Sequence, residues 1–183
     1  MKTNRLLPDV TFYLRCRDPQ KVFDKDPNPF VWEYRTTKDL FAGKKVVIFG
    51  LPGAFTPTCS NSQLPGYEAL SEDFRLLGID EIWCTSVNDA FVMFQWAKAQ
   101  GVKNIKMLPD GNGCFAEKLG YLVDKSNLGF GKRSWRYAML VDDLHIVEEF
   151  VEPSQMDDCP TDPYGESAPE NVLEKLSKLI NGE

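Results

Sequence analysis

Short apolar runs separated by helix-like stretches constrain this 183-residue chain more than any other feature. KVVIFG at 45–50 and EIWCTSV at 81–87 predict strands that are buried on both faces. The stretches that follow them, 58–77 and 88–101, carry apolar residues at spacings of three and four, which is typical of amphipathic helices. Strands that alternate with helices in this way predict an α/β fold around a central sheet.

Alternating apolar segments near both ends extend this pattern. Near the N-terminus they predict a β-hairpin of strands 9–17 and 30–35, joined by the loop 18–29. Later in the chain they predict an antiparallel pair of strands, 136–142 and 144–152, joined at Asp142-Asp143. Shorter patterns predict one more strand at 105–110. They also predict three helical segments, at 36–45, 114–121 and 168–180. We therefore expect one domain over 1–183, with a mixed sheet flanked by helices.

Two residues predict details of the helices. Pro65 is expected to bend the helix 58–77, because proline lacks an N–H. Asn88 is expected to cap the next helix, which ends before Gly101.

The charge and apolar content exclude several classes of protein. A net charge of −6 argues against sequence-independent nucleic-acid binding, and GKR at 131–133 is the one hint of a basic patch. No run approaches the roughly 18 apolar residues of a membrane span. The start, MKTNRLLPDV, lacks the apolar stretch of a signal peptide. We expect a cytoplasmic protein with neither nucleic acid nor membrane as partner.

The cysteines favour a reducing compartment and functional thiols. They are odd in number, scattered and without a CxxC pair, unlike structural zinc sites or disulfide scaffolds: Cys16, Cys59, Cys84, Cys114 and Cys159.

Cys59 follows the buried strand 45–50, at the edge of the sheet where α/β folds bind ligands. If Thr56-Pro57 begins the helix, Cys59 lies in its first turn, where free N–H groups and the helix dipole favour the thiolate. The thiolate is the reactive form of cysteine. The alternative is a small apolar core residue, and the local sequence leaves both readings open.

PGAFTPTCS at 52–60 resembles the active-site segment of the peroxiredoxins: a proline, three residues, a threonine, two residues and a cysteine. Three further blocks, in the same order, resemble the type-II (type-5) branch of that family: SVNDAFVMFQWAK at 86–98, LPDGNG at 108–113 and SNLGFGKRSWRYAML at 126–140. The resemblance spans about residues 5 to 180. It implies a thioredoxin-like fold and a thiol-dependent peroxidase that needs no metal or organic cofactor.

By this resemblance, the active-site residues are Cys59, Thr56, Pro52 and Arg136. The Cys59 thiolate would attack one peroxide oxygen and become a sulfenic acid. Arg136 would stabilise the thiolate and donate to the peroxide, and Thr56 would orient it. Pro52 would shield the sulfur from water.

The spacing alone also allows Lys132 or Arg133 as the active cation, and the resemblance selects Arg136. The only histidine, His145, is expected to have a surface or structural role. This weakens the reading as a Cys–His hydrolase, which needs a base beside its nucleophile.

The sulfenic acid must then meet a second thiol. Cys159 is a candidate resolving cysteine, because some type-II peroxiredoxins carry one shortly after a stretch like VEP at 151–153. It lies in SQMDDCPTDPYG, a polar segment that we expect to be mobile, and Asp157-Asp158 should raise the pKa of its thiol. Other members rely on glutathione, glutaredoxin or thioredoxin, so both routes stay open.

The remaining expectations concern the surroundings of the site. Cys84 is expected to be buried and structural, and Cys114 accessible. An apolar rim of Phe55, Phe91 and Phe130 would admit small alkyl hydroperoxides as well as hydrogen peroxide. The resemblance implies a homodimer. Two rival functions are a catalytically silent thioredoxin-like binding module and a redox sensor that signals through oxidised Cys59.

Overall fold

The computed structural model describes residues 5–21, 25 and 27–182 of the chain, so 22–24 and 26 of the predicted loop 18–29 lie outside it. Within this part, six strands form the main sheet. In spatial order they are β1 (Arg5–Leu6), β10 (His145–Val151), β9 (Tyr137–Asp142), β4 (Lys45–Gly50), β5 (Glu81–Ser86) and β6 (Lys106–Pro109). β4, β5 and β6 are parallel, whereas β9 runs antiparallel to β4 and β10 antiparallel to β9. The predicted mixed sheet is confirmed.

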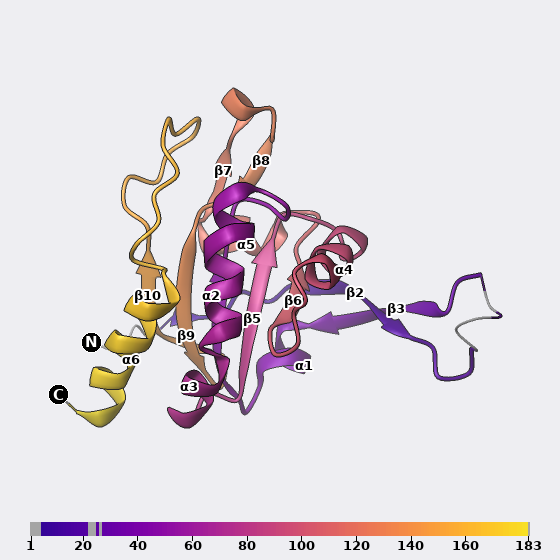
Figure 1. The fold of residues 1–183 in the computed structure, drawn as a ribbon, viewed down its shortest axis with the longest axis horizontal. Helices are drawn as coiled ribbons and strands as arrows, with labels where there is room; N and C mark the ends of the chain where they lie inside the picture. The colour runs from indigo at the N-terminus through magenta and orange to yellow at the C-terminus, as the bar shows by residue number, and fades with distance from the viewer. Residues whose placement is uncertain (1–4, 22–24, 26, 183) are drawn as a thin grey trace.

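Two pairs of strands lie outside this sheet. β2 (Thr11–Arg17) and β3 (Phe30–Thr36) form the predicted hairpin, which projects from the body on the right of Figure 1. β7 (Leu122–Asp124) and β8 (Lys132–Ser134) form a short arm, seen at the top of the figure, that the sequence patterns did not predict. The edge strand β1 was also not predicted.

Helices cover both faces of the sheet. One face packs against α1 (Thr37–Phe41) and α5 (Cys114–Leu119), and the other against α2 (Leu64–Ala69), α3 (Ser71–Leu76), α4 (Ala90–Ala99) and α6 (Pro169–Asn181). β4 shows the two-residue alternation that separates these layers: Val46 and Ile48 face the first apolar core, and Val47 and Phe49 face the second. The predicted thioredoxin-like α/β fold is therefore observed.

The helix after β4 differs from the single helix predicted over 58–77. A π-helical segment, η1 (Cys59–Gln63), begins two residues after the helix start, and in it the N–H of Leu64 bonds to the carbonyl of Cys59. Pro65, which has no N–H to donate, follows directly, so the interruption lies where a bend was expected. A second break, at Leu70, separates α2 from α3.

Two predicted turn and cap positions were wrong by one residue. Asp89, and not Asn88, caps α4, because its carboxylate accepts from the N–H groups of Phe91 and Val92. The tight turn between β9 and β10 is centred on Asp143-Leu144, where both residues have positive φ.

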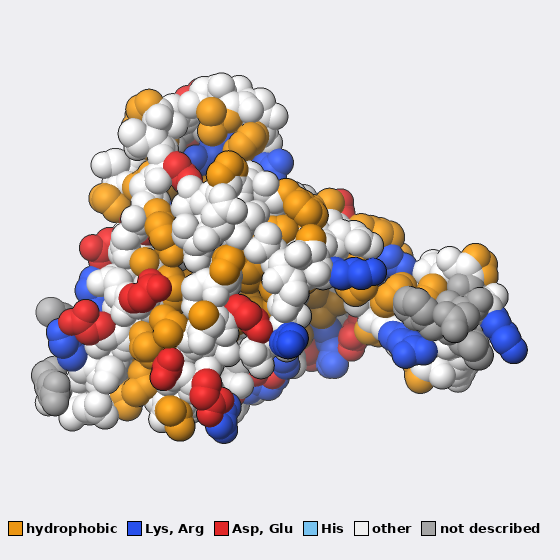
Figure 2. Space-filling model, in the orientation of Figure 1, with side chains coloured by type: hydrophobic (Ala, Val, Ile, Leu, Met, Phe, Trp, Pro, Cys, Tyr) orange, Lys and Arg blue, Asp and Glu red, His pale blue; other side chains and the backbone are white. Residues whose placement is uncertain are grey.

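The charges are unevenly spread over the face in Figure 2, where Lys and Arg side chains appear along the hairpin and acidic side chains over the lower left of the body. Among the residues described, none of the helices has the length and apolar character needed to cross a bilayer.

One glycine is required where β4 meets β9. A Cβ atom on Gly50 would overlap the fully buried ring of Tyr137, its partner in β9. We predict that Gly50→Ala lowers the free energy of unfolding by about 2 kcal/mol, measured by urea denaturation, because overfilling a packed core has costs of this order.

The matched control is Gly165→Ala. A Cβ atom there meets open space and φ is not positive, so we expect a change within about 1 kcal/mol of wild type. Equal stability of the two variants would contradict the packing argument.

Candidate active site

The loop between β4 and η1 forms a tight turn. The Thr56 hydroxyl donates to the carbonyl of Gly53 at 2.8 Å, and Phe55 adopts φ = 65°, a conformation that is strained for a residue other than glycine. Pro52 is buried at the start of this turn. The loop is thus folded back on itself, with Thr56 leading into the helix.

Cys59 lies in the first helical turn, as predicted. The helix begins at Pro57, and the N–H of Ser60 donates to the carbonyl of Thr56 at 3.0 Å. The Ser60 hydroxyl in turn accepts from the indole Nε1 of Trp96 at 3.0 Å, which ties this turn to α4. The Cys59 side chain is fully buried in the second apolar core.

Arg136 directly precedes β9 and places its guanidinium against this sulfur. Its Nη1 lies 3.5 Å from Cys59 Sγ and donates to Gln63 Oε1 at 2.6 Å, while its Nη2 donates to Asp162 Oδ1 at 2.5 Å. Only 2% of Arg136 is exposed. Burial alone would lower the pKa of this guanidinium, but the nearby sulfur and the Asp162 carboxylate raise it above the ordinary value. The side chain is a permanent buried cation.

Of the other two candidate cations, Arg133 lies against the site loop beside Gly53. Arg133 approaches the carbonyl of Val87 at 3.5 Å and the amide oxygen of Asn88 at 3.4 Å. Lys132 is exposed on β8. Of the three cations, Arg136 is the one in hydrogen-bond contact with Cys59 Sγ.

Sequence reasoning missed three polar residues around the site: Gln63, Asn88 and Asp162. Asn88 accepts from the N–H of Ala54 at 3.0 Å and from the hydroxyl of Ser86 at 2.7 Å, so it fixes the loop before Cys59 to the end of β5. Gln63 follows Cys59 by four residues, a helical spacing that could have indicated it. Asp162 has no comparable signal, because it comes from a distant loop.

Most side chains of residues 152–168, which we call the strap, are exposed, but Cys159 is not. Cys159 is buried, with 3% exposed, and belongs to the first apolar core, whereas Cys59 belongs to the second. The predicted rise in its pKa is wrong. Hydrogen bonds from the backbone and hydroxyl of Thr161 lower the pKa of the Cys159 thiol.

All five cysteines are free thiols. Cys84 is buried as predicted, and burial raises its pKa well above the ordinary value. Cys114 is exposed. Burial and the nearby Glu33 raise the pKa of Cys16. The exposed His145 lies with its Nδ1 3.0 Å from the carbonyl of Asp143, which agrees with a surface role.

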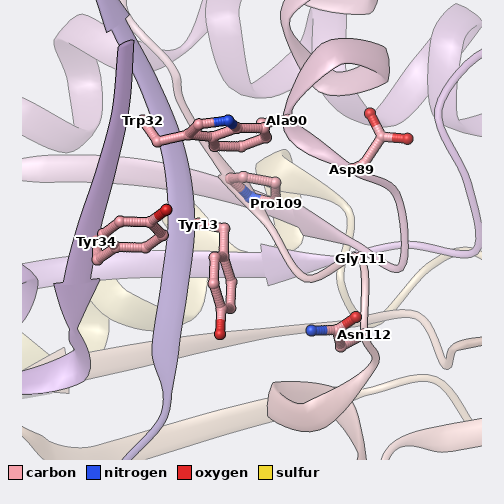
Figure 3. Close-up of a pocket in the computed structure, with 8 residues that line it drawn as sticks. All are labelled: Tyr13, Trp32, Tyr34, Asp89, Ala90, Pro109, Gly111 and Asn112. Atoms are coloured by element: carbon pink, nitrogen blue, oxygen red, sulfur yellow. The ribbon is translucent and has the colours of Figure 1, made fainter.

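A separate cavity of about 270 Å³ lies between the hairpin and the start of α4 (Figure 3). Tyr13, Trp32 and Tyr34 of the hairpin line one side, and Figure 3 shows the Asn112 side chain directed toward Tyr13. Phe91, expected on the rim of the active site, instead packs edge-on against Trp32, with ring centroids 5.6 Å apart. The four predicted site residues do not line this cavity.

The comparisons with known proteins agree on one family. The Redoxin family matches residues 2–164. A peroxiredoxin of Synechocystis is 55% identical over 174 residues, 95% of this chain and 90% of the relative. The hybrid peroxiredoxin hyPrx5 of Haemophilus influenzae is 44% identical over 93% of this chain and 64% of its own length. The crystal structure of a Plasmodium falciparum antioxidant protein, a 1-Cys peroxiredoxin, superposes with a TM-score of 0.88 at 37% identity, over 96% of this chain and 99% of that one.

A buried thiol in the first turn of a helix, a guanidinium in contact with it and these relatives lead to one conclusion. The chain belongs to the peroxiredoxins, in the type-II (type-5) branch, and is a thiol-dependent peroxidase.

Proposed function

We propose that Cys59 is the residue that attacks the peroxide. Three further side chains complete the active site: Pro52, Thr56 and Arg136. The observation that carries this assignment is the 3.5 Å contact between Arg136 Nη1 and Cys59 Sγ inside the apolar core. A fixed positive charge at this distance stabilises negative charge on sulfur, and its effect is strong where water is excluded.

The reaction is a two-electron oxidation of sulfur. The Cys59 thiolate attacks one peroxide oxygen, the S–O bond forms and the O–O bond breaks, which leaves a sulfenic acid. The other oxygen departs with the bonding electron pair and takes up a proton, so it leaves as water or an alcohol. A donor thiol then displaces water to form a mixed disulfide. A second thiol releases Cys59 and leaves as the oxidised disulfide.

Each partner has a task that follows from its contacts. Arg136 Nε is buried and has no acceptor among the described residues, so it is free to donate to a peroxide oxygen. The Thr56 hydroxyl donates its proton to Gly53, which leaves its oxygen lone pairs to accept from the peroxide O–H. Pro52 adds no donor and limits access of water.

The proposed substrates are hydrogen peroxide and small alkyl hydroperoxides, because only the O–O group has to reach the buried sulfur. Glutathione, glutaredoxin or thioredoxin would return the enzyme to the thiol. The scattered, unbridged cysteines support a reducing compartment such as the cytoplasm.

The direct test is peroxide consumption with a thiol donor present. We predict that Cys59→Ser reduces the rate to that of the donor alone, because a hydroxyl cannot replace the thiolate as nucleophile. The exposed Cys114 supplies the matched control, and Cys114→Ser should retain the wild-type rate.

The same assay separates the rival functions. Many turnovers per Cys59 support the enzyme, and a single stoichiometric oxidation would instead indicate a sensor. An inert wild-type protein would favour the silent binding module and would contradict the proposed role of Cys59.

The reductant is the second open point. Cys59 and Cys159 belong to the apolar cores on opposite faces of the sheet, so a bond between them requires the strap to leave its place. We therefore favour an external thiol, with Cys159 as the alternative resolving residue.

We predict that Cys159→Ser keeps at least about half of the wild-type turnover with glutathione and glutaredoxin, since Cys159 Sγ is packed away from the site. Peptide mapping of the peroxide-treated protein without reductant is the companion measurement. A Cys59–Cys159 cross-link, with turnover lost in Cys159→Ser, would assign the resolving role to Cys159.

We also expect a homodimer. Phe55 beside the active site is 57% exposed, which supports a partner surface around the site loop. Sedimentation should give twice the monomer mass, and Phe55→Asp should shift the equilibrium toward monomer by introducing a charge into the interface. A wild-type protein that sediments as a monomer would contradict this.

A further inference from the structure

The orientation of Arg136 depends on two acceptors that lie on different sides of the guanidinium. Nη1 is fixed by Gln63, which lies on the same helix as Cys59, and Nη2 is fixed by Asp162 from the strap. Because the guanidinium is planar, contacts at both terminal nitrogens define the direction of the whole group. This orientation directs Nη1 to Cys59 Sγ and leaves Nε free.

The strap that carries Asp162 is anchored on its C-terminal side by a buried carboxylate. Glu152, with 3% exposed, accepts from the N–H of Gly165 at 2.8 Å and from the N–H and hydroxyl of Ser167 at 2.9 and 2.8 Å. The carbonyl of Ser167 accepts from the Tyr67 hydroxyl at 2.8 Å. These bonds tie the strap to the core beside α2.

The N-terminal side of the strap is anchored to the β7–β8 arm. Asp157 accepts from the N–H of Asp124 at 2.7 Å, and Asp158 accepts from the N–H of Asn127 at 2.9 Å. Asp162 is therefore presented to Arg136 from a segment that is held at both sides. The ring of Tyr164, 5.6 Å from the guanidinium carbon, adds a second contact from the strap.

Asp162 can influence the sulfur in two ways that have opposite signs. Its negative charge opposes the thiolate, so its removal would speed attack on peroxide. Its hydrogen bond orients Arg136, so its removal would slow attack. The side chain of Asp162 is 47% exposed, and water screens its longer-range effect on Sγ. The direct bond to buried Arg136 is screened much less, so the orienting effect should dominate.

We propose that Asp162 is a positioning residue for the peroxidase reaction, which acts by fixing Arg136 against Cys59 and the incoming peroxide. The inference rests on the proposed role of Cys59. The strap is then part of the active site, although it contributes no atom that touches the sulfur.

The test compares two reactions of Cys59 in the full-length reduced protein. Oxidation by hydrogen peroxide needs both a thiolate and donors aimed at the peroxide, whereas alkylation by iodoacetamide needs the thiolate and displaces iodide without them. Both rates are followed by acid quench and mass spectrometry of the Cys59 peptide. Asp162→Asn keeps the size of the side chain and removes its charge, so the charge-assisted bond to Arg136 Nη2 is replaced at best by a weaker bond to a neutral amide oxygen.

We expect Asp162→Asn to slow oxidation by about ten- to a hundredfold, the scale of a misaligned catalytic group. Alkylation should stay within about twofold, because Gln63 still holds Nη1 against the sulfur and keeps the thiolate stabilised. Asp162→Glu should recover most of the oxidation rate, since it restores the carboxylate. In an Arg136→Gln background, Asp162→Asn should change oxidation by less than about twofold, because the effect passes through Arg136.

The matched control is Glu166→Gln. Glu166 also lies in the strap, is 51% exposed and pairs with a surface cation, Lys175, at 2.7 Å. The Glu166→Gln substitution removes the same charge without touching Arg136, so this variant should be oxidised and alkylated at the wild-type rates.

Three results would overturn the proposal: oxidation of Asp162→Asn at the wild-type rate or faster, an equal loss in oxidation and alkylation, or an equal loss in Glu166→Gln. A wild-type protein whose Cys59 is alkylated but not oxidised would instead refute the proposed function itself, so the two failures are distinguishable.

Discussion

The contact between Arg136 and Cys59 is the interaction on which the rest of the site depends. An arginine with 2% exposure loses most of its hydration, and a buried cation is tolerated only when partners replace the water. Gln63 and Asp162 replace it at the two terminal nitrogens, and the sulfur shares one of them. Three chain segments must therefore meet at one point: the helix after β4, the start of β9 and the strap.

The topology of the sheet explains how two of these segments meet. β4 and β9 are antiparallel neighbours, and Gly50 at the end of β4 pairs with Tyr137 at the start of β9. The residues just beyond these two positions consequently emerge at the same edge of the sheet. Cys59 follows β4 and Arg136 precedes β9, so the pairing brings residues 77 positions apart into contact.

The thiols of this chain illustrate how environment decides reactivity. Cys84 lies in the same apolar core as Cys59, and burial raises its pKa. Cys159 is equally hidden, yet hydrogen bonds from Thr161 lower its pKa. Cysteine content alone indicates neither result, because each depends on the burial of the sulfur and on the groups within a few ångströms of it.

The sequence by itself determined the α/β fold, the hairpin, the position of Cys59 in a first helical turn and, through family resemblance, the four candidate residues. Such features are encoded locally, by the period of apolar residues and by proline near a helix start. Tertiary structure alone decided that Cys159 of the strap is buried in the first apolar core, that Asn88 anchors the site loop, and that Asp162 reaches Arg136. These contacts join residues far apart in sequence, and no local pattern records which distant groups will meet once the core has formed.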